Sequence, residues 1–341
     1  MPRVRPTVIT LVLLFAGMLT ACSGQTAPAE TSAQVSTPTP TSAPTHTPSV
    51  RVVGGGEKPP VVFGGDCAAA LDGEVIAAAT GISDAVVSQR DVRWTRSVNN
   101  LGGLTCEWSA DGASGRVTII PQHALGDAEL SAESHRASFE ECGWTCAWLW
   151  ESKGLWISGW ESDLGEKGRE EADRRGELIG DAIASRVNPD DIEWTRDTAL
   201  WAPKQDCTAL AADIGERLGG TLEGEVAGYH DPPGPATNIA DLAAGRTWCL
   251  LSVSTEAVAM VILHSGLAWD VPWAQDGELF DLGVAGITAY DVGRGQGYLG
   301  GTNVEMSDGT NSILVEVADA APWDSTQVVT AVAEYVQSGL I

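Results

Sequence analysis

Basic residues are scarce in this chain. Its 341 residues include 20 Lys and Arg against 46 Asp and Glu, which gives a formal net charge of −26 at pH 7. Such a charge repels the phosphates of nucleic acids and the headgroups of anionic lipids, so neither is expected as a partner. The acidic balance instead favours a solvated surface, cations or a basic partner.

The chain also has no apolar run long enough to span a bilayer. The apolar segment 7–19 is shorter than the roughly 20 residues that a transmembrane helix needs. It follows Arg3 and Arg5 and ends in small residues, which is the pattern of a secretory signal peptide. We therefore predict a signal peptide over residues 1–21. Its removal takes away these two arginines and changes the net charge from −26 to −28.

The end of this signal carries a further motif, Leu19-Thr20-Ala21 followed by Cys22. It resembles the bacterial lipobox, in which the chain is cut before the cysteine and the thiol carries a lipid. The resemblance implies that Cys22 is the first residue of the mature protein. Its acyl groups, palmitate among them, would anchor the protein to the outer face of the cell membrane. The alternative is an ordinary secretory cut that leaves Cys22 free.

Common catalytic signatures are missing. The sequence has no Gly-x-Ser-x-Gly, His-Glu-x-x-His or Gly-x-x-x-x-Gly-Lys motif. Acidic pairs such as Glu140-Glu141 and Asp190-Asp191 would form a glycosidase couple only if folding brought the right carboxylates together. The histidines without ligand spacing are His46, His123, His135, His230 and His264. No catalytic residue, metal ligand or cofactor is predicted, and the sequence favours a binding protein over an enzyme.

Residues 22–63 form a predicted linker. Segment 23–50 is dominated by Thr, Pro, Ser and Ala and has almost no large apolar residue. Such a segment cannot bury enough surface to offset the entropy of ordering it, so we expect it to be disordered.

The folded part contains a pattern that occurs twice. Asp66-Cys67 and Asp206-Cys207 each place an aspartate where it can cap a helix N-terminus. About a dozen helix-tolerant residues follow each pair before a glycine ends the run.

Alternating strands follow in each copy, at residues 104–108 and 116–120 and again at 246–251 and 257–263. A second hairpin and a final helix come next. The final helices span 169–187 and 326–340. Leu178 is among the residues expected to face inward in the first of them, and Val328 and Val332 are among those in the second. We predict two related α+β domains, 64–188 and 189–341, each an antiparallel sheet packed against its first and last helices.

Six cysteines remain after Cys22, an even number that predicts disulfides formed outside the cytoplasm. Fifteen pairings are possible in principle. The repeat favours Cys67–Cys106, Cys142–Cys146 and Cys207–Cys249.

These features together resemble a group of actinobacterial cell-envelope lipoproteins. The shared features are the lipobox, the Thr/Pro-rich linker, Asp-Cys opening a helix, and a later Cys-x-Trp, here Cys106-Glu107-Trp108. The second copy has Leu251 in place of the tryptophan, and the Cys142/Cys146 pair lies outside the pattern. The resemblance covers both domains loosely and implies a binding or sensing module without catalytic residues.

The most distinctive stretch contains four tryptophans with strand alternation: Trp148, Trp150, Trp156 and Trp160. A three-residue turn at 152–154 would place them on one indole face, opposite an aliphatic face. This face either packs against a loop or the second domain, or forms a platform for a sugar ring, a lipid or an aromatic ligand. The cleft between the domains is the other candidate ligand site.

The sequence therefore predicts a lipid-anchored, extracytoplasmic binding or interaction protein. Its membrane contact is the anchor at Cys22, and its partner is an envelope protein, a glycan or a lipid ligand. One alternative is a cell-wall carbohydrate hydrolase that uses paired carboxylates beside the same indoles. Another is the solute receptor of a transporter, but that class is built from βαβ units rather than hairpins.

Overall fold

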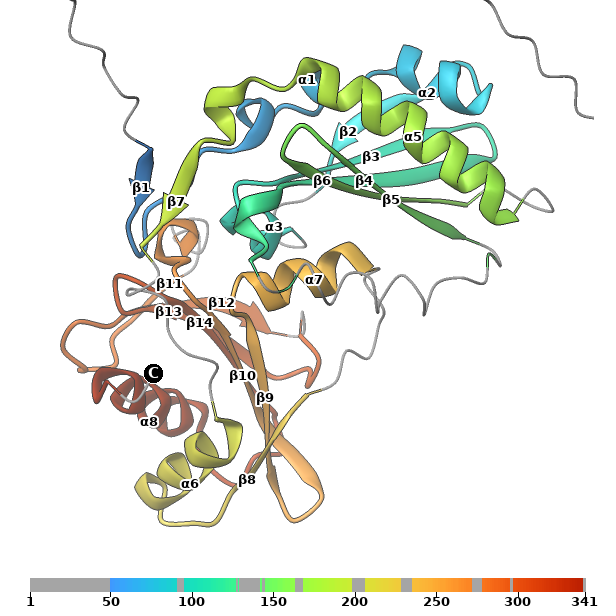
Figure 1. The fold of residues 1–341 in the computed structure, drawn as a ribbon. Coiled ribbons are helices and arrows are strands. Elements are labelled where there is room, and N and C mark those ends of the chain that lie inside the picture. The colour runs from blue at the N-terminus through green and yellow to red at the C-terminus, as the bar shows by residue number, and fades with distance from the viewer. Residues whose placement is uncertain are drawn as a thin grey trace, which may run out of the picture. The chain divides into compact units, whose positions relative to one another are not determined.

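A computed structural model of the chain has the predicted α+β class, with antiparallel sheets and covering helices (Figure 1). It describes residues 50–90, 95–126, 128, 142, 145–162, 168–197, 206–227, 235–271, 278–294 and 297–339. Cys22, the signal peptide and most of the predicted linker lie outside the described residues.

Two antiparallel sheets contain most of the strands. The five-stranded sheet has the order β2 (Val86–Gln89), β3 (Leu104–Ala110), β4 (Ala113–Pro121), β6 (Leu155–Glu161), β5 (Cys146–Ser152). The seven-stranded sheet has the order β11 (Glu278–Phe280), β12 (Thr288–Arg294), β13 (Thr302–Ser307), β14 (Ser312–Val317), β10 (Glu256–His264), β9 (Thr247–Val253), β8 (Glu223–Val226). Short parallel strands β1 (Arg51–Val53) and β7 (Trp194–Arg196) form a third, separate pair.

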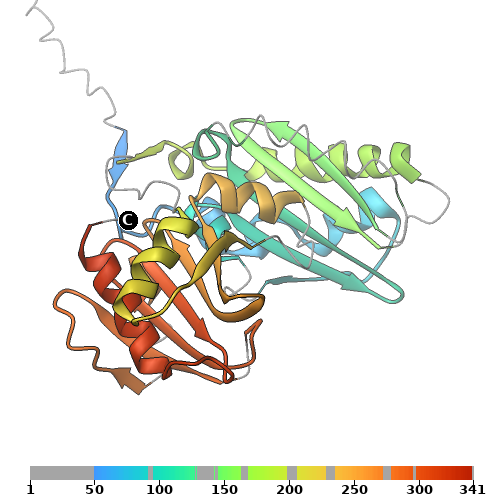
Figure 2. The same ribbon diagram turned by 90° about the horizontal axis from the view of Figure 1, so that it is seen from below.

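Helices cover one face of each large sheet. The described helices are α1 (Cys67–Ala70), α2 (Gly73–Thr80), α3 (Arg96–Asn100), α5 (Gly168–Arg186), α6 (Cys207–Arg217), α7 (Pro235–Ala243) and α8 (Ser325–Gln337). Figure 1 shows α2 and α5 on the same face of the five-stranded sheet. α6 and α8 lie side by side over the seven-stranded sheet in both ribbon views (Figure 1 and Figure 2).

Aspartate side chains begin the two predicted first helices. Asp66 accepts a hydrogen bond from the backbone N–H of Ala68, and Asp206 accepts one from Thr208, both at 2.9 Å. These bonds satisfy N–H groups that have no partner inside the helix. The predicted helix starts are therefore confirmed.

The first of these helices is shorter than predicted. α1 ends after Ala70, and Leu71 has extended backbone with φ −146° and ψ 129°. Asp72 then caps α2 by accepting from the N–H of Val75 at 2.9 Å. One continuous helix of about a dozen residues is wrong here, because a second aspartate offers the backbone a competing start. α2 ends as predicted at Gly81, in the left-handed conformation.

The final helices agree with the sequence in position but not in every inward residue. In α5, Leu178 is 45% exposed, so its predicted inward orientation is wrong, whereas Ile179 and Ile183 are fully buried. In α8, Val328 and Val332 are buried as predicted.

The six described cysteines pair in the predicted order. The pairs are Cys67–Cys106 (the α1–β3 disulfide), Cys207–Cys249 (the α6–β9 disulfide) and Cys142–Cys146 (the short disulfide). The first two each fasten the start of a helix to the second strand from one edge of a sheet. These disulfides indicate an oxidising compartment outside the cytoplasm.

Three apolar clusters form the core. One lies between the five-stranded sheet and its helices, and another lies between the seven-stranded sheet and α6 and α8. The third joins Leu101 after α3 and Trp156 of β6 to Ile239 of α7, so it crosses the predicted boundary at residue 188. Residues 49–341 form one compact unit, and the division into two domains stays a prediction. Within the part of the chain that the structure describes, no helix is both long enough and apolar enough to cross a membrane.

Candidate functional site

The β5–β6 hairpin has a different register from the predicted one. Ser152 pairs with Leu155, so the turn contains two residues, Lys153 and Gly154, both with positive φ. Trp150 consequently lies opposite Ile157, and Trp156 lies opposite Glu151. A shift of one residue moves a side chain to the other face of a sheet. The single indole face is therefore wrong, because Trp148 and Trp150 lie on one face and Trp156 and Trp160 on the other.

The helix α5 covers the first pair of tryptophans. Trp148 is 3% exposed, and its ring fills the space where a Cβ on Gly159 or Gly176 would lie, at 2.2 Å and 2.8 Å. Trp150 packs in the same way over Gly180, and its indole N–H donates to Asp181 at 3.0 Å. Glycines in the strand and in the helix thus allow the rings to lie flat between the two elements.

The second pair faces the opposite side of the sheet. Trp156 is 1% exposed and belongs to the third cluster, which α3 and α7 complete. Trp160 is partly buried, with the Arg116 guanidinium 5.2 Å from its ring centre. The four indoles therefore do not form one continuous surface.

A buried ionic cluster lies where the cleft between the two predicted domains was expected. Arg96 of α3 donates to Asp270 and to Glu305 of β13, each at 2.7 Å, and also to Ser312 at 3.0 Å. Although burial opposes its charge, the two carboxylates raise the pKa of Arg96, while burial raises the pKa of Asp270. Two carboxylates therefore sit beside a guanidinium rather than lining an open cleft.

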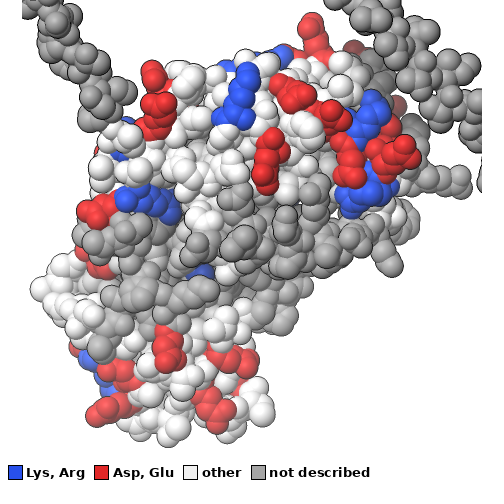
Figure 3. Space-filling model, viewed as in Figure 1, with Lys and Arg blue, Asp and Glu red and all other residues white. Residues whose placement is uncertain are grey.

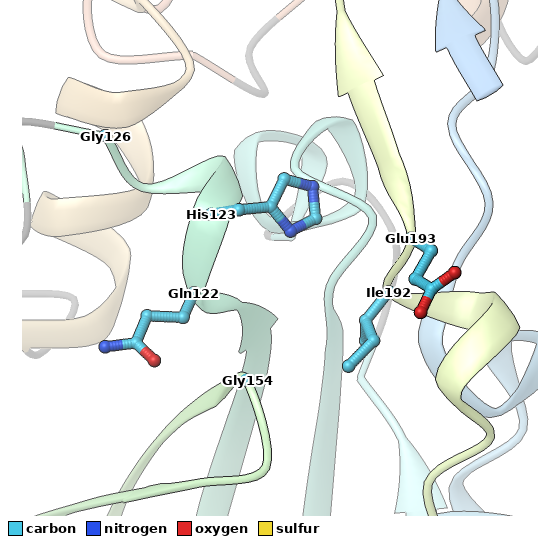
Figure 4. A pocket seen from close by; sticks show the side chains of 6 residues that line it. All are labelled: Gln122, His123, Gly126, Gly154, Ile192 and Glu193. Atoms are coloured by element: carbon cyan, nitrogen blue, oxygen red, sulfur yellow. The ribbon is translucent and has the colours of Figure 1, made fainter. Parts of the chain in front are cut away.

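An open pocket lies instead at the end of the five-stranded sheet, near β7. It has a volume of about 420 Å³ and is lined by Gln122, His123, Gly126, Gly154, Ile192 and Glu193 (Figure 4). The lining comes from three places: the 3-10 helix η3 (Gln122–Ala124) that follows β4, the β5–β6 turn, and the segment that enters β7. The N–H of Gln122 donates to the carbonyl of Gly154 at 2.8 Å, which holds the first two together.

In Figure 4 the imidazole of His123 extends from η3 toward the segment that carries Ile192 and Glu193. The imidazole also packs edge-on against the indole of Trp194, with ring centres 5.0 Å apart. Burial on that side, and secondarily the charge of Arg196, lower the pKa of His123. A neutral imidazole has one donor and one acceptor, so at pH 7 this wall of the pocket makes hydrogen bonds without adding charge.

Arg196 of β7 is largely enclosed. Its guanidinium lies over the Trp194 ring, 5.7 Å from the centre, and donates to the carbonyl of Asn100. Burial lowers the pKa of Arg196 to about 9, so it remains charged at pH 7. The Trp194 indole therefore contacts both the imidazole of His123 and the guanidinium of Arg196.

Comparison with known proteins adds no relative. No protein-family model, curated protein or solved structure matches this chain. The function must therefore be inferred from the site itself.

The remaining sequence candidates have structural explanations or lie outside the described part. Among the described residues, no group of three His, Cys, Asp or Glu could hold a metal ion. Glu140-Glu141, His46, His135 and His230 are outside the described residues, and Asp190-Asp191 lies in the 3-10 helix η5 (Pro189–Asp191) before β7. The glycine-rich loop at 297–300 is held by Glu316, which accepts from the N–H groups of Tyr298, Leu299 and Gly300.

Sequence analysis missed the pocket because its walls are far apart in the chain. In the sequence, His123 stands out only as a histidine without ligand spacing, and Glu193 is not singled out. The one signal available was a polar pair directly after a strand, Gln122-His123. The contact of β7 with η3, which lies about 70 residues earlier in the chain, has no local sequence signature.

Proposed function

We propose that this chain is a lipid-anchored, extracytoplasmic protein that binds a small ligand, or a side chain of a partner, in the pocket beside His123. No catalysis is part of this proposal. The lipobox at Cys22 supports the anchor, and the disulfides support the compartment. The domain limits 64–188 and 189–341 and the likeness to envelope lipoproteins belong to the same proposal.

The pocket is the observation that carries the binding role. Ligand sites are concave, have volumes of about 300–1,000 Å³ and contain a few convergent polar groups. This pocket has a volume of about 420 Å³. Its lining combines the imidazole of His123, the amide of Gln122 and the carboxylate of Glu193 with the apolar side chain of Ile192. The ligand is thus expected here rather than on the tryptophan hairpin, whose rings are mostly covered.

The two alternatives have less support. A hydrolase needs two carboxylates that flank a groove. The buried carboxylates described here instead contact arginines or backbone N–H groups, as Glu161 contacts Arg175 at 2.7 Å. A transporter receptor needs repeated βαβ units, whereas both large sheets are antiparallel.

Two measurements test the proposal. Metabolic labelling with a fatty acid should mark the wild-type protein and not Cys22→Ser, which should be released from the membrane fraction. A thermal-shift screen of envelope-derived small molecules should find ligands that stabilise the wild type but not the double variant Gln122→Ala/His123→Ala. Equal stabilisation of both proteins would place binding elsewhere.

A further inference from the structure

We propose that the short disulfide, Cys142–Cys146, is a site of thiol–disulfide exchange with a protein dithiol outside the cytoplasm. This site is separate from the pocket, and the inference does not depend on the proposed binding function. It follows from the unequal exposure of the two sulfurs and from the charged groups beside the strand that carries the buried one.

The two cysteines of this disulfide differ in exposure. Cys142 is partly exposed, whereas Cys146, the first residue of β5, is 1% exposed. The cysteines of the α1–β3 and α6–β9 disulfides are all at most 4% exposed. An attacking thiolate needs access to one sulfur, so Cys142 is the one it reaches among the six described disulfide cysteines. Cys146 is then the leaving thiol.

A buried carboxylate lies opposite the leaving thiol. Cys146 pairs with Glu161 of β6, and side chains directly opposite each other on paired strands share a face, with Cβ atoms about 4.5–5.5 Å apart. Glu161 is 1% exposed and accepts from Arg175 at 2.7 Å, while its Oε1 is buried without a hydrogen bond. Burial raises the pKa of Glu161, although Arg175 and the nearby Trp148 indole favour its ionised form. Glu161 is therefore placed to supply the proton that Cys146 needs when the S–S bond breaks.

A cation also lies close to the start of β5. Arg169, in the first turn of α5, donates to the carbonyl of Ala147, the residue after Cys146. Figure 3 shows basic and acidic side chains gathered over this end of α5, at the right of the view. A nearby arginine stabilises a thiolate, so this corner of the sheet favours the chemistry that exchange requires.

The exchange moves two electrons and two protons from the partner to the chain. One partner thiolate attacks Sγ of Cys142, which forms a mixed disulfide and breaks the bond to Cys146. The electron pair of that bond stays on Sγ of Cys146, which takes up a proton. The second partner thiolate attacks the partner's sulfur in the mixed disulfide, and Cys142 leaves and is protonated from water. The partner ends as a disulfide and the chain as two thiols, and each step is reversible.

Reduction of this pair leaves the other connections of the fold in place. The short disulfide joins residues 4 apart, so it restricts the unfolded chain less than disulfides that join residues 39 and 42 apart. The α1–β3 and α6–β9 disulfides still fasten their helices to the two sheets. The reduced chain is therefore expected to be a folded product of the exchange.

Reduction of the folded full chain by dithiothreitol tests the assignment. Samples are quenched with iodoacetamide at intervals, and mass spectrometry identifies the alkylated cysteines. We expect Cys142 and Cys146 to react at least about ten times faster than the other four, which need a local opening first. The far-ultraviolet circular dichroism should stay unchanged during this first reduction. Equal reduction of a second disulfide, or unfolding at the first step, overturns the proposal.

The pH dependence of this reduction tests the part that Glu161 plays. The charged groups that face Glu161 from α5 are Arg175 and Glu171. Between pH 5 and 8, the rate divided by the concentration of dithiothreitol thiolate should rise as the pH falls, because protonated Glu161 supplies the leaving thiol. Glu161→Gln should abolish this rise.

Glu171→Gln is the matched control. Glu171 contacts the same Arg175, and hydrogen bonds from Arg174 and Arg175 lower its pKa to about 2, so it is ionised over the whole range. This variant should keep the rise. A flat profile in the wild type, or an equal rise in Glu161→Gln, overturns the role of Glu161.

The redox state in the cells that produce the protein separates exchange from mere accessibility. Acid quenching followed by thiol alkylation should find a fraction of the wild-type chain reduced at Cys142 and Cys146, with the other four cysteines oxidised. Treatment of the cells with the thiol oxidant diamide should remove that fraction. A pair that is fully oxidised in untreated cells overturns the exchange, because no partner dithiol then reaches it.

Discussion

Removing the disulfides one at a time should destabilise the protein by unequal amounts. The α1–β3 and α6–β9 disulfides connect residues 39 and 42 positions apart, whereas the short disulfide connects residues 4 apart. In the chain-entropy model the long loops each contribute about 4 kcal/mol at 25 °C and the short loop contributes about 2 kcal/mol. Replacement of both cysteines of a pair by alanine should therefore lower the free energy of unfolding about twice as much for either long-loop disulfide as for the short disulfide.

Packing adds to this difference rather than reducing it. Both cysteines of each long-loop pair are at most 4% exposed, so alanine also removes buried sulfur there. Cys142 of the short disulfide is only partly buried. The order of the three variants should hold even if the absolute values differ from the entropy model.

Guanidinium unfolding measures the loss of stability in each variant, and hydrogen exchange detected by mass spectrometry shows where in the fold it occurs. Loss of the α1–β3 disulfide should lower protection mainly in β3 and β4, and loss of the α6–β9 disulfide mainly in β9 and β10. The double-alanine variant of the short disulfide is the matched control. If that variant loses as much stability as the other two, loop closure is not the source of the stabilisation.

Three further substitutions test the packing and the charges. Arg96→Met should destabilise by about 3–5 kcal/mol in guanidinium unfolding, because Glu305 would lose its buried partner; a loss below about 1 kcal/mol would contradict the buried pair. Gly176→Ala should lower the melting temperature although alanine favours helices by about 1 kcal/mol, because its Cβ would lie 2.8 Å from Trp148; a higher melting temperature would refute this contact. Burial and two nearby arginines hold the pKa of His264 well below its ordinary value, so the unfolded chain takes up the proton first and stability should fall as the pH drops below about 6.5. In urea unfolding between pH 5 and 7, the slope of the free energy of unfolding against pH should reach about 1.4 kcal/mol per pH unit in the wild type and be smaller in His264→Gln. Equal slopes in the two proteins would contradict this prediction.

Local signals predicted much of the scaffold. Asp66 and Asp206 mark helix starts because a carboxylate can accept from free N–H groups whatever the rest of the fold does. The cysteine that follows each aspartate then pairs with the cysteine of a strand in the same copy. Such features depend on a few neighbouring residues, so the sequence alone was enough to place them.

Local signals predicted neither the register of the β5–β6 hairpin nor the contacts between segments far apart in the chain. A glycine at 154 accommodates a turn of two or three residues equally well, and only the paired strands decide between them. The choice determines which side of the sheet Trp150 and Trp156 occupy. The pocket is still harder to predict, because η3 and the entry to β7 are about 70 residues apart and meet only in the folded chain.

A comparison of the two large sheets supports the proposal that they belong to related domains. The order β2-β3-β4-β6-β5 matches β8-β9-β10-β14-β13, and one row of paired residues can be followed across each sheet. The rows are Gln89, Cys106, Val117, Gly159, Trp148 and Val226, Cys249, Val261, Val315, Val304. Each begins at the last residue of an edge strand and passes through the disulfide cysteine next. The rows differ at the edge, where Gln89 stands against Val226, and at their far end, where a glycine and a tryptophan in one row take the place of two valines in the other. Cores tolerate exchanges that conserve total volume. Two unrelated sheets would have no reason to place their disulfides in the same register, whereas two copies of one scaffold that diverged by such exchanges would retain it.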